Sequence, residues 1–222
     1  MKKICFILLL GFSAIQIMAQ NAVGFDAGYL RTHISIAEYI RSGRSTSLLD
    51  SVSISPDNGS FQAAFTTDID LGKGLFLSTG FHYARKGMNR VAFSDSATTY
   101  FVEATQHYVG LSVLIEYRYK FKKSRFGIFA GAGPQIDFAV GKPNNGVLYS
   151  GKGTNLLMPF CRFSETDLSV AVEAGPTFKS GPGDFFVKLC YHYGLSDVLE
   201  DPYVIGRSSS FGISAGYRVR LK

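Results

Sequence analysis

Residues 108–121 read Tyr-Val-Gly-Leu-Ser-Val-Leu-Ile-Glu-Tyr-Arg-Tyr-Lys-Phe, and their side chains alternate in character with a period of two. The odd-numbered positions from Val109 to Phe121 are all apolar or aromatic, whereas the even-numbered positions from Gly110 to Lys120 are mainly glycine, serine or charged residues. Because successive side chains of a strand point to opposite faces, this period predicts a single long strand. An apolar outer row opposite a small and charged inner row is typical of the wall of a transmembrane β-barrel.

This stretch resembles the signature strand of the PorT-like outer-membrane β-barrel family of Bacteroidetes, which usually has a proline at the position of Ser112. The Gly-rich residues 129–134, Phe-Ala-Gly-Ala-Gly-Pro, are similar to the strand that follows in that family. The resemblance implies an outer-membrane barrel and a link to protein secretion across the outer membrane. Most members of the family are generic barrels, so the resemblance implies no defined activity.

The first residues of the chain predict export. Lys2 and Lys3 precede an apolar run over residues 4–12, and small and mixed residues then lead to Ala19. A basic start, a short apolar run and a final small residue are the features of a secretory signal peptide, and the run is too short to span a bilayer as a helix. We therefore predict a signal peptide over residues 1–19 and an outer-membrane barrel domain over residues 20–222. Removal of its two lysines lowers the formal net charge from +6 to +4.

The alternating pattern recurs along the rest of the chain and predicts eight strands. They cover residues 23–36, 60–71, 75–85, 108–121, 125–140, 161–179, 184–194 and 208–222. The connections alternate between long polar segments, over residues 38–59, 86–106, 141–160 and 195–207, and short turns. Outer-membrane barrels have an even number of strands, short periplasmic turns and longer outer loops. We therefore predict an all-β, eight-stranded antiparallel, up-and-down transmembrane barrel with both termini in the periplasm.

Alternation alone does not distinguish a membrane barrel from a soluble lipocalin-like barrel, in which the apolar face points inward. The charges on the polar face at mid-strand favour a hydrophilic lumen, and the aromatic residues of the apolar face gather near the strand ends as interface girdles do. The girdle expected at the periplasmic side is Phe25, Tyr117, Tyr119, Phe126, Phe178, Phe185 and Tyr217, and the girdle at the outer side is Tyr29, Phe61, Tyr83, Tyr108, Phe138, Tyr191 and Phe211.

The last strand carries a third indication of a membrane barrel. Ser214, Gly216, Val219 and Leu221 are similar to the signal, polar-x-Gly-x-x-apolar-x-apolar, by which the barrel-assembly machinery recognises last strands. Lys222 stands where the terminal aromatic residue of that signal usually lies. We therefore expect this machinery as a partner, together with outer-membrane lipid and lipopolysaccharide.

Charged and polar side chains on the inner face predict a network in the lumen. Its expected members are Asp26, Asp68, His82, Glu116, Arg118, Asp137, Glu173, Lys188, His192 and Arg218, with Asp70 and Arg220 further along the same faces. Because the interior of an eight-stranded barrel is just wide enough for its own side chains, we expect a plug of paired charges. The alternative is a path for protons or small solutes.

These features predict an integral barrel of the Gram-negative outer membrane that acts as a structural or interaction protein through its extracellular loops or periplasmic turns, with no enzymatic activity and no cofactor. The alternatives are a small-solute channel and a lipid acyltransferase, for which His33, Asp95 and Ser96 are the candidate residues because a triad depends on geometry and not on spacing. No metal-ligand spacing is present, and basic residues are spread singly, so no nucleic-acid partner is expected.

Two pairs of residues carry further expectations. Cys161 and Cys190 fall at different heights of the predicted barrel, which favours two free thiols over a disulfide. Pro134 and Pro176 fall inside strands, and a closed barrel has no edge strand to accommodate them. Each proline should therefore mark a bulge or a locally missing hydrogen bond between strands.

Overall fold

The protein, described here from a computed structural model over residues 22–39, 51–54, 58–94, 99–150, 155–157, 164–198 and 204–221, is built from antiparallel strands. Eight of them form the wall of a barrel: β1 (Ala22–Tyr39), β3 (Asn58–Gly72), β4 (Leu75–Ser94), β5 (Thr99–Lys120), β6 (Phe126–Ser150), β8 (Thr166–Ser180), β9 (Gly183–Gly194) and β10 (Val204–Arg220). Two short strands, β2 (Ser51–Ile54) and β7 (Asn155–Leu157), pair with β4 and β6.

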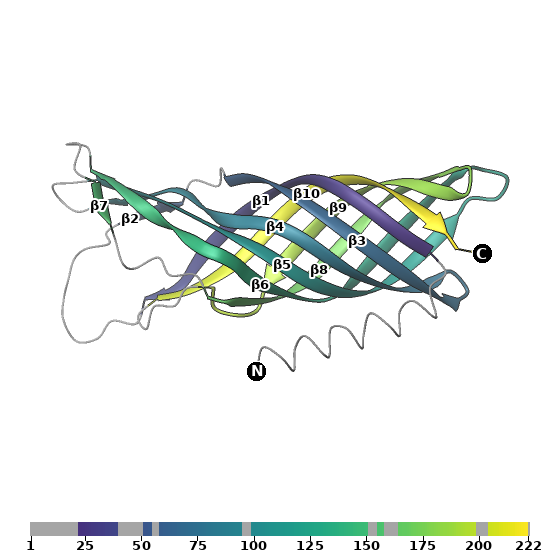
Figure 1. The fold of residues 1–222 in the computed structure, drawn as a ribbon, viewed down its shortest axis with the longest axis horizontal. Helices are drawn as coiled ribbons and strands as arrows, with labels where there is room; N and C mark the ends of the chain where they lie inside the picture. The colour runs from purple at the N-terminus through teal and green to yellow at the C-terminus, as the bar shows by residue number, and fades with distance from the viewer. Residues whose placement is uncertain are drawn as a thin grey trace.

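Each wall strand pairs with the next one along the chain, and the first pairs with the last, so the sheet closes on itself (Figure 1). Closure begins at Ala22, which lies opposite Arg220, and the pairing of β1 with β10 continues to Tyr39 opposite Val204. Where all eight wall strands pair, closure leaves no unpaired strand edge, which a sheet in a bilayer requires because lipid cannot satisfy backbone groups. The predicted fold, an eight-stranded antiparallel barrel, is confirmed.

The two ends of the barrel differ in their connections. One end, named here the turn end, holds the start of β1, the end of β10 and three short turns (Figure 1). The turn between β3 and β4 places Lys73 (φ 55°) and Gly74 (φ 83°) in the left-handed region, as a two-residue hairpin requires. The Asp70 carboxylate accepts a hydrogen bond from the Gly72 amide at 2.7 Å and fixes the approach to this turn. The opposite end is named the loop end.

Three strands, β4, β5 and β6, run much further towards the loop end than predicted. Pairing between β4 and β5 continues from Tyr83 opposite Val109 to Ser94 opposite Thr99, and pairing between β5 and β6 continues to Tyr100 opposite Ser150. The predicted polar segments 86–106 and 141–160 are therefore partly strand, because polar residues on extended hairpins can satisfy their backbone groups in a ladder. Other predicted bounds were wrong by a few residues: β1 ends at Tyr39 and not at residue 36, β8 begins at Thr166 and not at residue 161, and β10 spans Val204–Arg220 and not 208–222.

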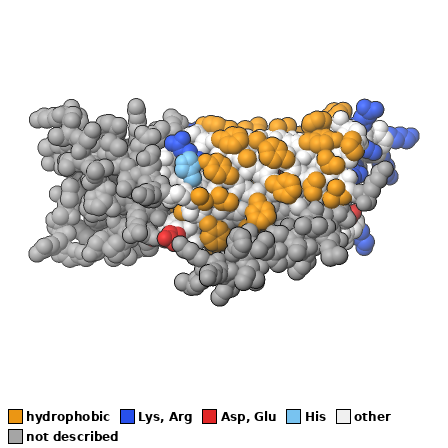
Figure 2. Space-filling model, viewed as in Figure 1, with side chains coloured by type: hydrophobic (Ala, Val, Ile, Leu, Met, Phe, Trp, Pro, Cys, Tyr) orange, Lys and Arg blue, Asp and Glu red, His pale blue; other side chains and the backbone are white. Residues whose placement is uncertain are grey.

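Alternation along the strands produces an apolar outer wall. Figure 2 shows hydrophobic side chains in a band across the visible face of the barrel, with Lys and Arg gathered at the turn end. Outward residues such as Phe25 and Ile115 are each 58% exposed, while their inward neighbours Asp26 and Glu116 are buried. The expected aromatic girdle was wrong at Tyr108, which is 1% exposed and lies inside the barrel. Tyr108 is separated from Gly110 and Glu116 by an even number of residues along β5, so its side chain points inward as theirs do.

Both strand prolines interrupt pairing without shifting its register. Pairing of β5 with β6 stops at Ser112 opposite Gln135 and resumes at Ile115 opposite Ala132, so Pro134 falls in the gap. The ladder between β8 and β9 is interrupted in the same way at Pro176. Of the two predicted outcomes, the locally missing ladder pair is therefore confirmed, because proline has no amide hydrogen to donate.

Some predictions fall outside the described part of the chain. These concern the signal peptide over residues 1–19, Cys161, and the acyltransferase candidates Asp95 and Ser96. Within the described ranges, no helix is long and apolar enough to cross a membrane.

Candidate functional site in the barrel lumen

All eight wall strands contribute charged side chains to the lumen. Three clusters of ion pairs follow one another from the turn end to the loop end, and each is defined below by its residues. Their carboxylates are almost inaccessible: Asp68, Glu116 and Asp137 are each 0% exposed. Buried charges are costly unless they are paired, so the geometry of each cluster decides whether the lumen is stable.

The arginine cluster, near the turn end, consists of Asp68, Glu116, Arg118 and Arg218. The Arg118 guanidinium lies 2.8 Å from the Asp68 carboxylate and 2.7 Å from that of Glu116. Arg218 lies 2.8 Å from the Asp68 carboxylate and 3.5 Å from that of Glu116. Two guanidinium groups and two carboxylates thus alternate around a closed set of contacts, and their formal charges cancel.

Aromatic rings flank the two arginines of this cluster. The Arg118 guanidinium lies 4.0 Å from the centroid of the Phe76 ring, and that of Arg218 lies 5.1 Å from the Phe186 centroid. Phe129 and Phe186 are buried and meet edge to face at 6.0 Å. A cation that lies over an aromatic face gains additional stabilisation. Each arginine of the cluster is therefore held both by carboxylates and by an aromatic ring.

The Lys188 cluster lies next along the barrel and consists of Asp26, Glu173 and Lys188. The Lys188 ammonium donates a hydrogen bond to the Asp26 carboxylate at 3.0 Å and lies 3.2 Å from the Glu173 carboxylate. Beyond it, the Gln62 amide donates to the Cys190 Sγ at 3.3 Å. One ammonium group therefore bridges carboxylates from β1 and β8.

The Lys86 cluster lies towards the loop end and consists of His82, Lys86, Asp137 and Asp167. The Lys86 ammonium lies 2.5 Å from the Asp137 carboxylate and 2.7 Å from that of Asp167. His82 contacts the other oxygen of Asp137. Hydroxyl and amide donors complete the coordination of the carboxylates: Gln135 to Asp137 at 3.0 Å, Ser208 to Asp167 at 2.7 Å and Ser196 to Asp167 at 3.2 Å.

The space left between these side chains is small. Between the Lys188 and Lys86 clusters lies a cavity of about 40 Å³, bordered by Glu173, Lys188, Cys190, His82 and His192. Such a volume accommodates roughly one water molecule. All six carboxylates of the three clusters contact a basic side chain within 3.5 Å. In the described lumen, no group of His, Cys, Asp and Glu has the arrangement of a metal site.

The comparison with protein families decides what kind of barrel this is. Residues 18–200 match the family described as outer membrane protein beta-barrel domain. The chain belongs to this family. It is therefore an integral protein of the Gram-negative outer membrane, and the apolar face of the wall meets lipid, which settles the direction of the alternation against a soluble lipocalin-like barrel.

Solved structures similar to this outer-membrane barrel share little of its sequence. Neisserial surface protein A is 17% identical, with a TM-score of 0.47 over 90% of this chain and 99% of that one. Ail of Yersinia pestis, solved with the heparin analogue sucrose octasulfate, is 14% identical, with a TM-score of 0.42 over 90% and 99%. The Escherichia coli outer membrane protease OmpT is 10% identical, with a TM-score of 0.40 over 91% and 97%. No curated protein matches the chain.

All ten residues expected in the lumen network of this outer-membrane barrel lie on its inner side, and nine of them belong to the three clusters. His192 lies apart, with its Nδ1 3.4 Å from the Ser210 hydroxyl. Asp70 and Arg220 were wrongly expected in the lumen. Both are exposed at the rim of the turn end, where Arg220 lies 2.7 Å from the Asp184 carboxylate.

Sequence reasoning missed Lys86 and Asp167, which form the centre of the Lys86 cluster. Lys86 had been placed in a long polar segment because the apolar alternation fades after Tyr83. The inward parity of His82 and Ala84, extended by two residues, would have placed Lys86 in the lumen. Asp167 has the parity of Ser169 and Ala171 and could have been found in the same way.

The remaining candidate residues are placed as follows. Ser214 is buried in the lumen, Gly216 lies opposite Asp26, Val219 lies on the outer face and Leu221 follows the end of β10. His33 lies on β1, where its carbonyl accepts a hydrogen bond from the Ser209 hydroxyl at 3.4 Å. Cys190 is a free, buried cysteine in the lumen.

Proposed function

We propose that this outer-membrane barrel is a non-conducting structural or interaction protein whose lumen is a salt-bridged plug. The observation that carries the proposal is the set of three ion-pair clusters that occupies the described lumen, with a cavity of about 40 Å³ between the Lys188 and Lys86 clusters. Ions or solutes would have to separate buried pairs in order to pass, at a cost of several kcal/mol for each pair. Binding then takes place at the ends of the barrel, through the outer loops or the periplasmic turns.

The turn end faces the periplasm in this proposal, and both termini lie there with it. Short periplasmic turns and longer outer segments are the rule for outer-membrane barrels. In this chain all three connections at the turn end are short, and the long extensions of β4, β5 and β6 lie at the loop end. The resemblance of residues 108–121 to the PorT-like family supports a partner in protein secretion. Lipopolysaccharide and the barrel-assembly machinery are the further partners that we propose, the latter through the end of β10.

The proposal includes no catalytic activity and no cofactor. His33, the candidate for an acyltransferase, lies on the outer wall of β1 towards the loop end, and its expected partners Asp95 and Ser96 lie outside the described residues. Lipid analysis of membranes that contain the His33→Ala variant tests this part of the proposal. An unchanged acylation pattern is expected, and loss of an acylated lipid would contradict it.

Conductance in planar bilayers tests the plug itself. The purified protein should give no stable conductance steps under a voltage that opens a general porin in the same bilayer. A variant that shortens three members of the arginine cluster, Glu116→Ala with Arg118→Ala and Arg218→Ala, serves as the positive control if it still inserts. Reproducible steps from the unchanged protein would show an open lumen, and the channel would then replace the plug as its function.

A further inference from the structure

A continuous row of aromatic side chains crosses six strands of the outer wall near the turn end. Each aromatic residue of the row is the direct pairing partner of the next one on the neighbouring strand. From β3 to β6 the row is Phe65, Phe25, Tyr217, Phe185, Phe178 and Phe126. Because the strands of a barrel are tilted, the row climbs from Phe126, the first residue of β6 at the turn end, to Phe65, which lies well inside β3.

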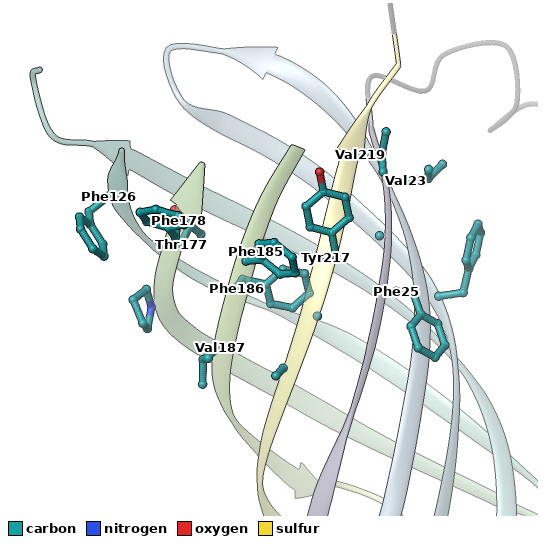
Figure 3. A pocket seen from close by; sticks show the side chains of 15 residues that line it. Val23, Phe25, Phe126, Thr177, Phe178, Phe185, Phe186, Val187, Tyr217 and Val219 are labelled. Carbon is teal, nitrogen blue, oxygen red and sulfur yellow. The ribbon is translucent and has the colours of Figure 1, made fainter. Parts of the chain in front are cut away.

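The row borders an apolar groove of about 680 Å³ on the lipid-facing wall, a size within the range of small-molecule sites. Small residues form its floor, including Ala215, Gly216 and Gly24. Figure 3 shows the rings of Phe126, Phe178, Phe185 and Tyr217 on neighbouring strands around it. The groove is therefore a recess between rigid rings and not a smooth part of the wall.

The rings that border the groove are held in place by their neighbours. The Phe185 and Tyr217 rings have centroids 4.6 Å apart, and those of Phe126 and Phe178 are 5.0 Å apart. The Tyr217 hydroxyl donates to the Ser180 carbonyl at 2.8 Å and ties the ring to the turn between β8 and β9. The groove is thus preformed, which lowers the entropy lost when an acyl chain binds.

Basic residues surround the mouth of the barrel next to this groove. At the described part of the turn end, seven exposed basic residues face two carboxylates, a formal excess of five positive charges. The basic residues are Lys73, Lys120, Lys122, Lys123, Arg125, Lys179 and Arg220, and the carboxylates are Asp70 and Asp184. The same gathering of Lys and Arg is visible beyond the apolar band in Figure 2.

Two of these basic residues continue directly from the aromatic row. Lys179 follows Phe178 and Arg125 precedes Phe126, and the Lys179 amide donates to the Arg125 carbonyl at 2.8 Å. Nearby, Arg220 lies 2.7 Å and Lys120 lies 4.0 Å from the single carboxylate of Asp184. Positive charge therefore exceeds negative charge at the point where the groove reaches the membrane surface.

We propose that this groove and the adjoining basic residues form a binding site for an anionic phospholipid. An acyl chain lies in the groove against the aromatic row, and the phosphate-bearing headgroup meets Lys179, Arg125 and Arg220. The groove opens into the lipid phase, where acyl chains are the apolar ligands present in excess. The excess of positive charge selects an anionic headgroup over a zwitterionic one. The proposed periplasmic position of the turn end would assign the lipid to the inner leaflet.

Native mass spectrometry of the detergent-solubilised protein tests the site, with phosphatidylglycerol and phosphatidylcholine of identical acyl chains added in equal amounts. The unchanged protein should retain phosphatidylglycerol preferentially. The Arg125→Gln/Lys179→Gln variant should weaken that retention by about fivefold for each cation removed, or roughly 25-fold in all. Ala215→Leu, which fills the floor of the groove, should weaken it while the rim charges remain.

Two matched variants control for nonspecific effects. Arg31→Gln/Arg207→Gln removes the same charge from exposed residues nearer the loop end, and Ala130→Leu enlarges an outward alanine that does not border the groove. Neither should change retention. The site would be overturned by equal retention of both lipids, by equal losses in the two charge variants, or by unchanged retention in Ala215→Leu. Heat-modifiable migration of every variant shows separately whether the barrel itself remains folded.

Discussion

Glu116 is the residue on which the pairing of the arginine cluster depends most, because it contacts both Arg118 and Arg218 and is fully buried. Glu116→Gln keeps the size of the side chain and removes its charge, which leaves two guanidinium groups sharing Asp68. Removing one partner of a buried pair typically costs about 3–5 kcal/mol. The variant should therefore lose its folded, fast-migrating form at a lower temperature than the unchanged protein.

Asp70→Asn provides the matched control for this change, since Asp70 is an exposed carboxylate of the same barrel end whose hydrogen bond to Gly72 an asparagine can also accept. Its effect should be small. If both variants migrated as the unchanged protein does at every temperature, the lumen charges would be well hydrated, and the channel hypothesis would gain at the expense of the plug.

Single residues also show how far the sequence predicts the site. The alternation within each strand placed Asp26, Glu116 and Lys188 in the lumen correctly. Once one residue of a strand is known to point inward, every second residue of that strand points inward too. Parity did not predict which charges meet. The alternation does not show, for example, that Lys188 pairs with Asp26 and Glu173. The stagger between neighbouring strands decides such contacts, and no local pattern in the sequence specifies it.

At the scale of the element, β8 contains a close approach that makes Gly175 sensitive. A Cβ at this position would meet the Val187 carbonyl oxygen and would lie 3.1 Å from the Lys188 Cα. Gly175→Ala should therefore push β9 away at the residue that holds the Lys188 cluster, and should destabilise the barrel by roughly 1–3 kcal/mol.

Equilibrium unfolding in urea, with the protein in lipid vesicles, measures the effect of this change. Ala174→Val, one residue away on the outer wall, is the control and should be nearly neutral. Alanine ordinarily suits a strand better than glycine does, so a stabilised Gly175→Ala variant would show that β8 and β9 do not approach each other this closely.

The middle of β5 should tolerate a charge on one face only. Val113 lies opposite Thr79 on the outer wall, and Ser112 borders the lumen cavity. Val113→Arg should cost about 2–4 kcal/mol near the bilayer midplane, whereas Leu71→Arg, at the turn end of β3, should cost about 0–1 kcal/mol. The same urea unfolding measures both, and equal costs would place Val113 away from the midplane.

Strand existence was predictable throughout the barrel, whereas strand ends were not. Within the membrane, lipid on one side and charge on the other impose the alternation that the sequence displays, as in residues 109–119 of β5. Beyond the membrane both faces of a hairpin can be polar, so the extension of β4 and β5 past Tyr83 and Val109 leaves no such pattern. The ladder continues there because backbone pairing does not depend on the character of the side chains.

The molecule as a whole has three layers: a lipid-facing apolar wall (Figure 2), a closed ladder of backbone pairs (Figure 1) and a lumen of buried ion pairs. The apolar wall is stable only against lipid, and the buried charges of the lumen are stable only when they are paired. The extensions of β4, β5 and β6 carry the loop end beyond the apolar band. The proposed binding role at the two ends fits this division better than passage through the centre would.

Cysteine labelling of neighbouring sites around the barrel tests this division most directly. In a Cys161→Ser/Cys190→Ser background, single cysteines are placed on three strands at an outward and an inward site: Val113 and Ser112 on β5, Val172 and Ala171 on β8, and Ile213 and Ser214 on β10. A thiol reagent confined to the lipid phase should label all three outward sites and none of the inward ones. Labelling of the inward sites with protection of the outward ones, or equal labelling of both, would contradict a barrel that is apolar outside and filled with paired charges inside.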